Sequence, residues 1–457
     1  MTATVTPQPA GSRRLLGELD KDSGRLERRG RSTAQDGRTD SGRDHLPRTS
    51  GVKLLSGSRA ERLGDPLEPD TRQDDQRDAA RENRLSALRE ERLRRRAGLR
   101  HLGPNWFAAV MGTGIVANAA VTLPLHFPGL RGAATVVWAL AALLLVALSS
   151  AWAVHWVRFS DSARDHLNHP VMSQFYGAPP MALLTVGAGT LLLGPDVIGR
   201  SAAVTVDWVL WSVGTVLGLL TAFAIPYRMF THHHVEPDAA FGGWLMPVVP
   251  PMVSAAMGAL LVPYVPAGQL RLTMILLCLA MFGMSLIAAL VTITMIWSRL
   301  VHHDTPEAGM VPTLWIVLGP LGQSVTAAGL LANAAPSALP DLYARGLTVF
   351  SVIFGVVTWG FAMLWLALAA AVTIKTARAG ELKFNLTWWG FTFPLGTCIT
   401  GSTVLYGHTG ANLFAAAAVA LYIVLVSAWA VVAMRTASGL LTATLLRPAP
   451  RNYRLPN

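Results

Sequence analysis

Residues 313–324 read TLWIVLGPLGQS and place a Gly-Pro-Leu-Gly break inside the apolar stretch 314–335. An apolar run of about 20 residues is the length a helix needs to cross a hydrocarbon core of about 30 Å. A break in such a helix frees backbone N–H and C=O groups, which cost several kcal/mol each if they face lipid and are tolerated where they line a wet cavity. The stretch therefore predicts an inner membrane helix beside a pathway.

Four similar breaks recur along the chain, at Gly112, Pro179, Pro250 and Pro394. Together with Pro320 they are separated by 67, 71, 70 and 74 residues, and smoother apolar stretches alternate with them. A repeat near 70 residues predicts five helix hairpins of one design. The expected fold is an all-α integral membrane protein of ten transmembrane helices, with five Gly/Pro-broken inner helices around a central pore. The alternative is that Gly and Pro serve only close helix packing, as they often do in membranes. The ten predicted spans are 105–122, 132–157, 171–194, 203–230, 245–264, 272–298, 314–335, 348–374, 386–406 and 412–434.

Composition supports this interpretation and excludes an ordinary soluble enzyme. Of the 457 residues, 52% are hydrophobic and 14% are charged, whereas about a quarter of the residues in soluble proteins are charged. The first 103 residues hold 40 of the 65 charges. Cys278 and Cys398 both lie in apolar stretches, so we expect small core residues rather than a disulfide framework or a metal–thiolate site.

The charged ends predict the orientation. Residues 1–103 are expected to form a disordered cytoplasmic tail with a basic juxtamembrane helix near 79–100 that lies on anionic membrane lipids, a solvated charged helix being the alternative. Residues 435–457 are expected to form a basic cytoplasmic tail around the transport domain 104–434. With both termini inside, the inner loops and C-terminus carry eleven basic residues and the outer loops four, as the positive-inside rule requires. Basic charge beside membrane helices also makes nucleic-acid binding a poor explanation of the net charge of +11.

The predicted spans carry no Asp, Glu, Lys or Arg at their centres. Asp207 and Arg228 lie near opposite ends of one span, where a charge can reach the interface. Proton and sodium pumps normally need intramembrane carboxylates, whereas glycine backbone, hydroxyls and broken-helix N-termini suit an anion that must be attracted but not trapped. The alternative for each polar residue is a hydrogen bond to a neighbouring helix. The candidate pore-lining residues are Gly112, Thr113, Gly114, Asn118, Ser173, Gln174, Tyr176, Pro179, Pro250, Ser254, Pro320, Gln323, Ser324, Thr326, Thr392, Pro394, Thr397, Thr400 and Ser402.

Histidines gather in the predicted cytoplasmic loops, at His166, His169, His232 to His234, His302 and His303. Because imidazole titrates near pH 6.5, a shared inner vestibule could attract anions at acidic pH. Solvated interfacial histidines are the alternative, and no ligand spacing supports a metal cluster.

Five motifs together resemble the tellurite-resistance/dicarboxylate transporter family, which includes malic acid permeases, sulfite efflux pumps, tellurite-resistance proteins and slow-type voltage-dependent anion channels. The motifs are PNWFAAVMGTGI (104–115), HPVMSQFYGAPPM (169–181), WLMPVVPPMV (244–253), TLWIVLGPLGQS (313–324) and NLTWWGFTFPLGTC (385–398). The resemblance implies a ten-helix subunit, a five-helix pore and a homotrimer. It also implies a phenylalanine pore gate at Phe393, with Phe391 as the second choice and core packing as the alternative role.

The predicted function is transport of small anions across the plasma membrane, either C4-dicarboxylates such as malate or oxyanions such as sulfite and tellurite. A passive chloride- or nitrate-type channel and a membrane-anchored sensor that uses the Arg-rich tail are the alternatives. An enzyme is not expected, because no nucleophile–base pair or metal triad occurs at helical spacing within the spans. No catalytic residue, metal or cofactor is predicted.

Overall fold

The computed structural model describes residues 81, 84–85, 98–442 and 445. These residues belong to the second of two compact units, Arg72–Asn457. The predicted tail 1–103, with its basic helix near 79–100, lies almost entirely outside the described residues, as does most of the segment after residue 442. The predicted disorder and lipid contact of these segments therefore stay predictions.

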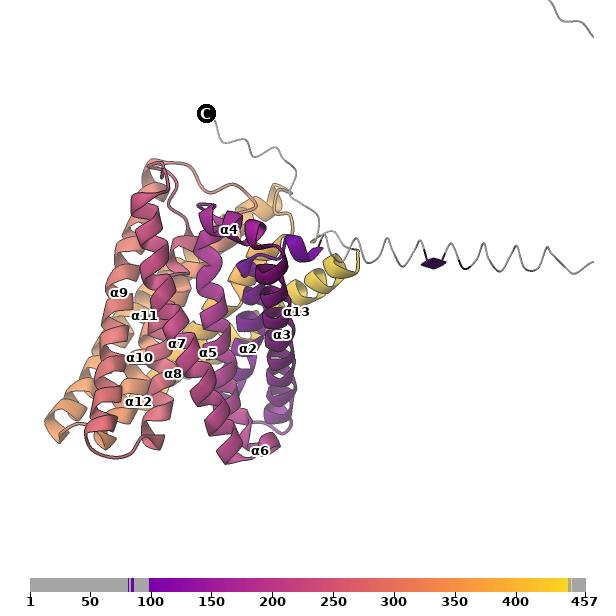
Figure 1. The fold of residues 1–457 in the computed structure, drawn as a ribbon. Coiled ribbons are helices and arrows are strands. Elements are labelled where there is room, and N and C mark those ends of the chain that lie inside the picture. Colours follow the sequence, from indigo (N-terminus) through magenta and orange to yellow (C-terminus); the bar gives the residue numbers. More distant parts are fainter. Residues whose placement is uncertain (1–80, 82–83, 86–97, 443–444, 446–457) are drawn as a thin grey trace, which may run out of the picture. The chain divides into compact units, whose positions relative to one another are not determined.

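The described part of the chain folds into helices, without a β-strand (Figure 1). Seven helical segments in it are long and apolar enough to cross a membrane. They are Leu130–Arg158 (α3), Met172–Leu193, Arg200–Thr231 (α7), Gln269–His302 (α9), Val311–Ser337, Asp341–Arg378 (α11) and Asn412–Leu441 (α13).

These segments differ sharply in burial. In α3, α7, α11 and α13, only 22% of the most apolar 18-residue window is buried, against 83% in Met172–Leu193 and 94% in Val311–Ser337. A helix that exposes apolar side chains on most of its surface is stable in lipid rather than in water. The poorly buried helices are thus suited to face the hydrocarbon, and the buried ones to form the interior.

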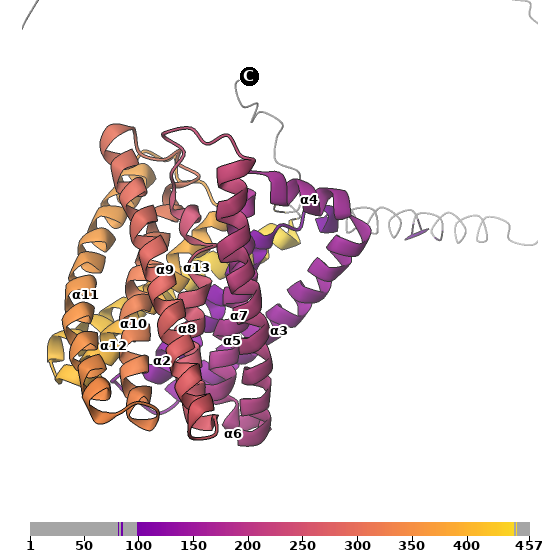
Figure 2. The same ribbon diagram turned by 60° about the vertical axis from the view of Figure 1, so that its left-hand side comes forward.

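Five buried helices make up that interior. They are α2 (Phe107–Thr122), α5 (Ala178–Leu193), α8 (Pro250–Leu261), α10 (Leu318–Ala334) and α12 (Phe393–Thr409). Each packs against the next, and α12 packs against α2, so the five form a closed ring. Each ring helix also packs against the long helix that follows it in the chain, namely α3, α7, α9, α11 or α13 (Figures 1 and 2).

A 3₁₀ segment precedes every ring helix. These segments are η1 (Pro104–Trp106), η2 (Met172–Gly177), η3 (Gly242–Leu245), η5 (Val311–Val317) and η7 (Leu386–Phe391). Four ring helices then carry proline in their first turn, where its missing N–H leaves no intrahelical bond unmade. The predicted breaks at Pro179, Pro250, Pro320 and Pro394 are therefore helix starts.

The predicted break at Gly112 is wrong, because α2 continues through this residue as regular α-helix. Gly112 instead permits close packing. A Cβ atom placed on it would collide with the hydroxyl of Thr392 and lie 2.7 Å from the ring of Trp389. In the first repeat the irregular backbone lies earlier, at Pro104–Trp106.

Two short helices join the long ones at opposite ends of the bundle, α4 (Ser160–Asn168) and α6 (Pro195–Ile198) (Figure 2). The sequence interpretation treats residues 160–168 as a loop. They form a helix that is held to the ring by a hydrogen bond, 3.1 Å long, from the Tyr176 hydroxyl to the Ala163 carbonyl oxygen. The short η4 (Val262–Tyr264) and η6 (Ala335–Ser337) follow α8 and α10.

Candidate functional site

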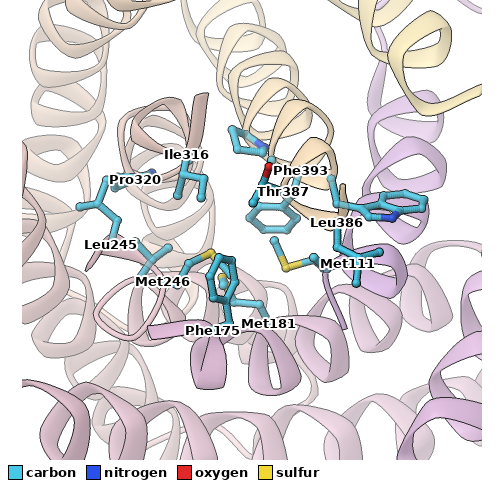
Figure 3. A pocket seen from close by; sticks show the side chains of 16 residues that line it. Met111, Phe175, Met181, Leu245, Met246, Ile316, Pro320, Leu386, Thr387 and Phe393 are labelled. Carbon is cyan, nitrogen blue, oxygen red and sulfur yellow. The ribbon is translucent and has the colours of Figure 1, made fainter. Parts of the chain in front are cut away.

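The beginnings of the ring helices and the segments just before them close around a small apolar cavity of about 30 Å³ (Figure 3). One water needs at least about 10–15 Å³ of such volume, so the space holds roughly two waters. We call it the constriction. All five repeats contribute to its lining, which is Ala108, Met111, Phe175, Met181, Leu245, Met246, Val249, Ile316, Gly319, Pro320, Leu386, Thr387, Trp389, Gly390, Phe393 and Pro394.

Phe393 is the first residue of α12 and lines the constriction, with only 3% of its surface exposed. In Figure 3 its ring lies in the same space as Met111, on the opposite side from Leu245. Pro394 follows it and constrains the backbone at this point. An aromatic ring at a helix start is therefore one wall of the narrow space.

Phe391, the second candidate for the gate, lies in a different environment. Its ring packs edge-on against Trp315 and Trp388, with centroids 5.1 and 5.7 Å away. It is absent from the lining of the constriction. The structure thus separates the two phenylalanines, placing Phe393 at the cavity and Phe391 in an aromatic cluster between η5 and η7.

The C-terminal halves of the same ring helices surround a second cavity of about 310 Å³, which we call the chamber. It has about ten times the volume of the constriction, and eight of its sixteen lining residues carry polar side chains. Because the beginnings of all five helices, or the segments just before them, meet at one cavity and their later turns at the other, the helices run parallel. The chamber is lined by Ile115, Asn118, Thr122, Ala188, Leu192, Met257, Leu260, Gln323, Thr326, Leu330, Asn333, Thr400, Thr403, Val404, Gly407 and His408.

Three side-chain atoms around the chamber are buried without a hydrogen-bond partner in the described part of the chain. They are the Gln323 Nε2, the Asn118 Oδ1 and the Thr403 Oγ1. A buried polar group normally has a partner, and leaving one unsatisfied costs about 1–3 kcal/mol. The Gln323 amide is 1% exposed and is a free donor at the wall of the chamber. It can therefore donate to a polar ligand or a water.

Other polar groups of the chamber are already paired. Thr326 and Thr400 share a hydrogen bond of 2.8 Å between their hydroxyls, which links α10 to α12. His408 contacts Asn333 through its Nε2 at 2.8 Å and the Ser351 hydroxyl through its Nδ1 at 3.0 Å. These hydrogen bonds hold the wall of the chamber in place, so the residues around the free Gln323 Nε2 donor are fixed.

Most of the predicted lining residues lie outside both cavities. Pro320, Phe393 and Pro394 line the constriction, and Gln323, with Asn118, Thr326 and Thr400, lines the chamber. Several hydroxyls instead donate to a carbonyl three or four residues earlier in the chain. These are Ser324 to the Leu321 carbonyl at 2.9 Å, Thr392 to Trp389 at 2.8 Å, Thr397 to Pro394 at 2.7 Å and Ser402 to Cys398 at 2.7 Å.

The remaining predicted residues face neighbouring segments. Trp429 of α13 donates to the Thr113 hydroxyl at 3.1 Å, Gly114 faces Thr185, and Pro250 packs against Gly218 of α7. Ser254 is fully buried, and its carbonyl accepts a bond of 2.9 Å from Trp211. Ser173 and Gln174 donate to the Pro170 carbonyl, Tyr176 bonds to α4, and Pro179 is buried outside both cavities.

Sequence reasoning missed Thr122, Asn333, Thr403 and His408 in the chamber. For Asn333, the sequence contained a signal that places it with the other polar residues of α10. Polar residues on α10 recur at Gln323, Thr326 and Asn333, which is the helical spacing of a single face. The wall of the chamber is that face, so tracing polar periodicity through each span would have found Asn333.

The histidines near the start of the ring helices do not favour charge at neutral pH. His166 stacks on His155 at 5.4 Å between ring centroids. Burial, together with the neighbouring His155, lowers the pKa of His166 to about 4. Burial also lowers the pKa of His169 and of His233. His166 therefore stays neutral at the pH where an ordinary histidine begins to titrate, and burial disfavours the charged form of the other two.

The placement of Asp207 contradicts the sequence interpretation, which put this side chain at the interface. Asp207 is 1% exposed and lies between α7 and α5. Within the described residues, no group of three or more His, Cys, Asp or Glu side chains is arranged to hold a metal ion. Cys278 and Cys398 are buried separately and free.

A ring of buried helices within exposed apolar helices, with two cavities between the ring members, is an arrangement typical of helical membrane proteins. The chain belongs to the voltage-dependent anion channel family, whose sequence profile matches residues 101–437. The resemblance drawn from the five motifs is thus confirmed, and the chain is a membrane transport protein.

Similar proteins include transporters from archaea and fungi. An uncharacterized transporter of Methanocaldococcus jannaschii is 29% identical over 350 residues, covering 76% of this chain and 96% of the relative. A sulfite efflux pump of Trichophyton rubrum is 29% identical over 351 residues, covering 75% and 92%. A malic acid transport protein of Schizosaccharomyces pombe is 22% identical over 310 residues, covering 65% and 68%.

Proposed function

We propose that the protein transports small anions through the centre of the ring, with oxyanions such as sulfite or C4-dicarboxylates such as malate as substrates. The observation that carries this proposal is the chamber with a free amide donor and no Asp, Glu, Lys or Arg among its lining residues. Neutral donors bind an anion without a fixed countercharge that would hold it too tightly. The names of the fungal relatives supply the two candidate substrate classes.

The proposed topology has ten spans in five hairpins. Three of the five ring helices, α2, α8 and α12, with 16, 12 and 17 residues, lie outside the seven longer segments, and a 3₁₀ segment precedes each of them. Together with the seven longer segments they complete five repeats. With both termini cytoplasmic, the constriction faces the cytoplasm and the chamber faces outward. The plasma membrane as location and a homotrimer as assembly complete the proposal, and the trimer follows from the family resemblance.

In this proposal Phe393 is the gate. A space for roughly two waters is too narrow for sulfite or malate, and its apolar wall disfavours water and ions. Movement of the Phe393 ring away from the axis would join the constriction to the chamber. Ring rotation at a helix start needs no rearrangement of the hydrogen-bonded wall of the chamber.

The test is reconstitution of the full-length protein into liposomes. Tracer flux and current would be recorded for sulfite, malate, nitrate and chloride, with protein-free liposomes as the control. Saturable flux of sulfite or malate is the expected result. Absence of flux for all four anions from correctly folded protein would overturn the proposal.

A passive channel for chloride or nitrate is the second candidate, and the neutral lining of the chamber favours it because such a pathway needs no coupling site. The same recordings distinguish the two. Voltage-driven chloride or nitrate current that does not saturate would identify a channel, whereas saturable flux identifies a carrier.

A further inference from the structure

Asp207 is a carboxylate buried within a candidate membrane span. It is the eighth residue of α7, is 1% exposed, and both of its carboxylate oxygens are buried without a hydrogen-bond partner in the described chain. Its Oδ1 lies against Gly187 of α5, where an added Cβ would be 2.5 Å from that oxygen. Glycine at this position therefore makes the room that the carboxyl group occupies.

The surroundings of Asp207 offer no countercharge at contact distance. Among the elements packed against α7, α5 and α8 carry no titratable residue, η2 carries Tyr176, and α6 carries Asp196. Asp196 is already paired with Arg131 of α3, at 2.6 Å. On α7 itself, Tyr227 and Arg228 lie near the far end of the helix.

Arg200 is the one cation on α7 that shares a face with Asp207, because seven residues make two turns. It forms no ion pair with Asp207 in the described structure. Its guanidinium instead lies over the ring of Tyr264 at 5.9 Å, and its Nη2 donates to the Tyr264 hydroxyl at 3.4 Å. Arg200 is exposed at the N-terminal end of α7. It is not ion-paired with Asp207, but it lies two turns away on the same face.

An ionised carboxylate in such a place is very unfavourable, since a buried charge without a partner is normally neutralised by taking up a proton. The neutral acid is compatible with the packing around Gly187. Ionisation would require the side chain to reach water or Arg200, and either movement would loosen the contact between α7 and α5. The protonation state of Asp207 is therefore coupled to the packing of α5 against α7.

The helix that Asp207 contacts belongs to the ring. Ala188, next to Gly187, and Leu192 line the chamber from α5. A change in the packing of α5 against α7 would thus alter the wall of the chamber. Asp207 lies behind this wall, separated from the chamber by the one helix.

We propose that Asp207 is a proton-binding site that couples anion transport to proton movement. When the proton is bound, Asp207 is a neutral carboxylic acid and α5 stays packed against α7. Release of the proton leaves a carboxylate, which turns toward water and Arg200 and shifts α5. The inference rests on the proposed anion transport and adds the coupling ion.

The experiment uses full-length protein in liposomes, with radiolabelled sulfite or malate and a pH-sensitive dye inside. The wild-type protein should accumulate anion when a pH gradient is imposed, with proton movement reported by the dye. Asp207→Asn, which keeps the shape but holds no exchangeable acid proton, should lose this accumulation. It should retain exchange of labelled for unlabelled anion at equal pH on both sides, because exchange needs no net proton movement.

The matched control is Asp341→Asn at the start of α11, where the carboxylate is exposed and pairs with Arg345 at 3.8 Å. This variant should behave as the wild-type protein does. Infrared spectroscopy at neutral pH should detect a protonated carboxylic acid band that Asp207→Asn removes and Asp341→Asn keeps.

The outcomes separate this inference from the proposed function. Wild-type anion flux without proton movement would overturn the coupling site and leave anion transport standing, whereas absence of all anion flux would overturn the proposed function. Accumulation that persists in Asp207→Asn would overturn the inference. Loss of both accumulation and exchange in a folded Asp207→Asn protein would also overturn it, because the residue would then be needed for the pathway itself.

Discussion

The constriction and the chamber are built by the same five helices, yet they differ in volume and in the share of polar side chains that line them. Near the helix starts, mostly apolar side chains close a space of about 30 Å³, and further along the same helices a space of about 310 Å³ opens, half of whose lining residues are polar. The difference follows from local backbone. Proline and the 3₁₀ segments at the helix starts bring bulky side chains inward, whereas regular α-helix beyond them presents Gln323 and its polar neighbours at helical spacing.

This contrast separates two physical tasks in the proposed transport. An apolar constriction controls passage because an ion must lose its water to cross it. A polar chamber controls which anion binds, because its donors replace part of that water. Substitutions at the constriction should therefore change the rate of transport, and substitutions at the chamber should change the affinity.

The largest effect is expected for Phe393→Ala. Removing the ring widens the constriction, and a barrier lowered by about 1.4 kcal/mol already gives a tenfold higher rate. We expect anion conductance to rise at least about tenfold, measured in planar bilayers or liposomes. Unchanged conductance in a folded variant would show that the ring is not the barrier.

Phe391→Ala is the matched control for the gate, since the same side chain is removed two residues away. Phe391 packs against Trp315 and Trp388 outside the constriction. Truncating a buried phenylalanine typically costs about 3–5 kcal/mol of stability. Phe391→Ala should therefore lower the thermal unfolding temperature while the conductance per folded protein stays the same.

A smaller effect, on affinity, is expected for Gln323→Leu. Leucine keeps most of the volume of the side chain but removes the free Nε2 donor of the chamber. A hydrogen bond to a charged group contributes about 1.5–3 kcal/mol, so the KM for the anion should rise about 10- to 100-fold. Saturation of tracer flux with substrate concentration measures this change.

Ser324→Ala tests whether the effect belongs to the chamber. The Ser324 hydroxyl donates to the Leu321 carbonyl of its own helix and lines neither cavity. Its removal should leave the KM within about twofold of the wild-type value, as the loss of one intrahelical bond is a stability effect of about 1 kcal/mol. An equal rise of KM in both variants would argue against binding at Gln323.

Much of the fold could be predicted from the sequence, because hydropathy and the interval near 70 residues are properties of the chain itself. The breaks predicted at Pro179, Pro250, Pro320 and Pro394 coincide with helix starts, because proline leaves a local signal in the sequence. The prediction at Gly112 was wrong because glycine occurs both where a helix is broken and where two segments pack closely. Only the position of Thr392 against Gly112 distinguishes these two cases.

The site was less predictable. Whether a hydroxyl faces a cavity depends on how its helix is rotated about the helix axis. The sequence indicates this rotation only through the spacing of polar residues along the helix. Gln323 lines the chamber, whereas Ser324, one residue later, bonds within α10. Asp207 was misplaced because its burial depends on Gly187, a residue of another helix.

The smallest effect concerns pH and the end of the bundle near the constriction, where the histidines lie. Burial lowers the pKa of His166 to about 4 in the folded protein, whereas an unperturbed histidine in the unfolded chain has a pKa near 6.5. As the pH falls from about 6.5 to about 4, the unfolded state takes up a proton that the folded state does not. Stability should therefore decrease through this window, and His166 should add no further loss below pH 4.

His166→Gln removes this titration while keeping a polar side chain of similar size. Thermal unfolding measured between pH 7 and pH 4 should show a shallower decline for this variant than for the wild-type protein. His126→Gln, in the exposed loop between α2 and α3, is the control for removal of an imidazole away from α4. Parallel slopes for His166→Gln and the wild-type protein would mean that His166 takes up its proton in the folded state. That result would restore a positively charged rim beside the constriction, and with it an acid-dependent attraction of anions at this end of the pathway.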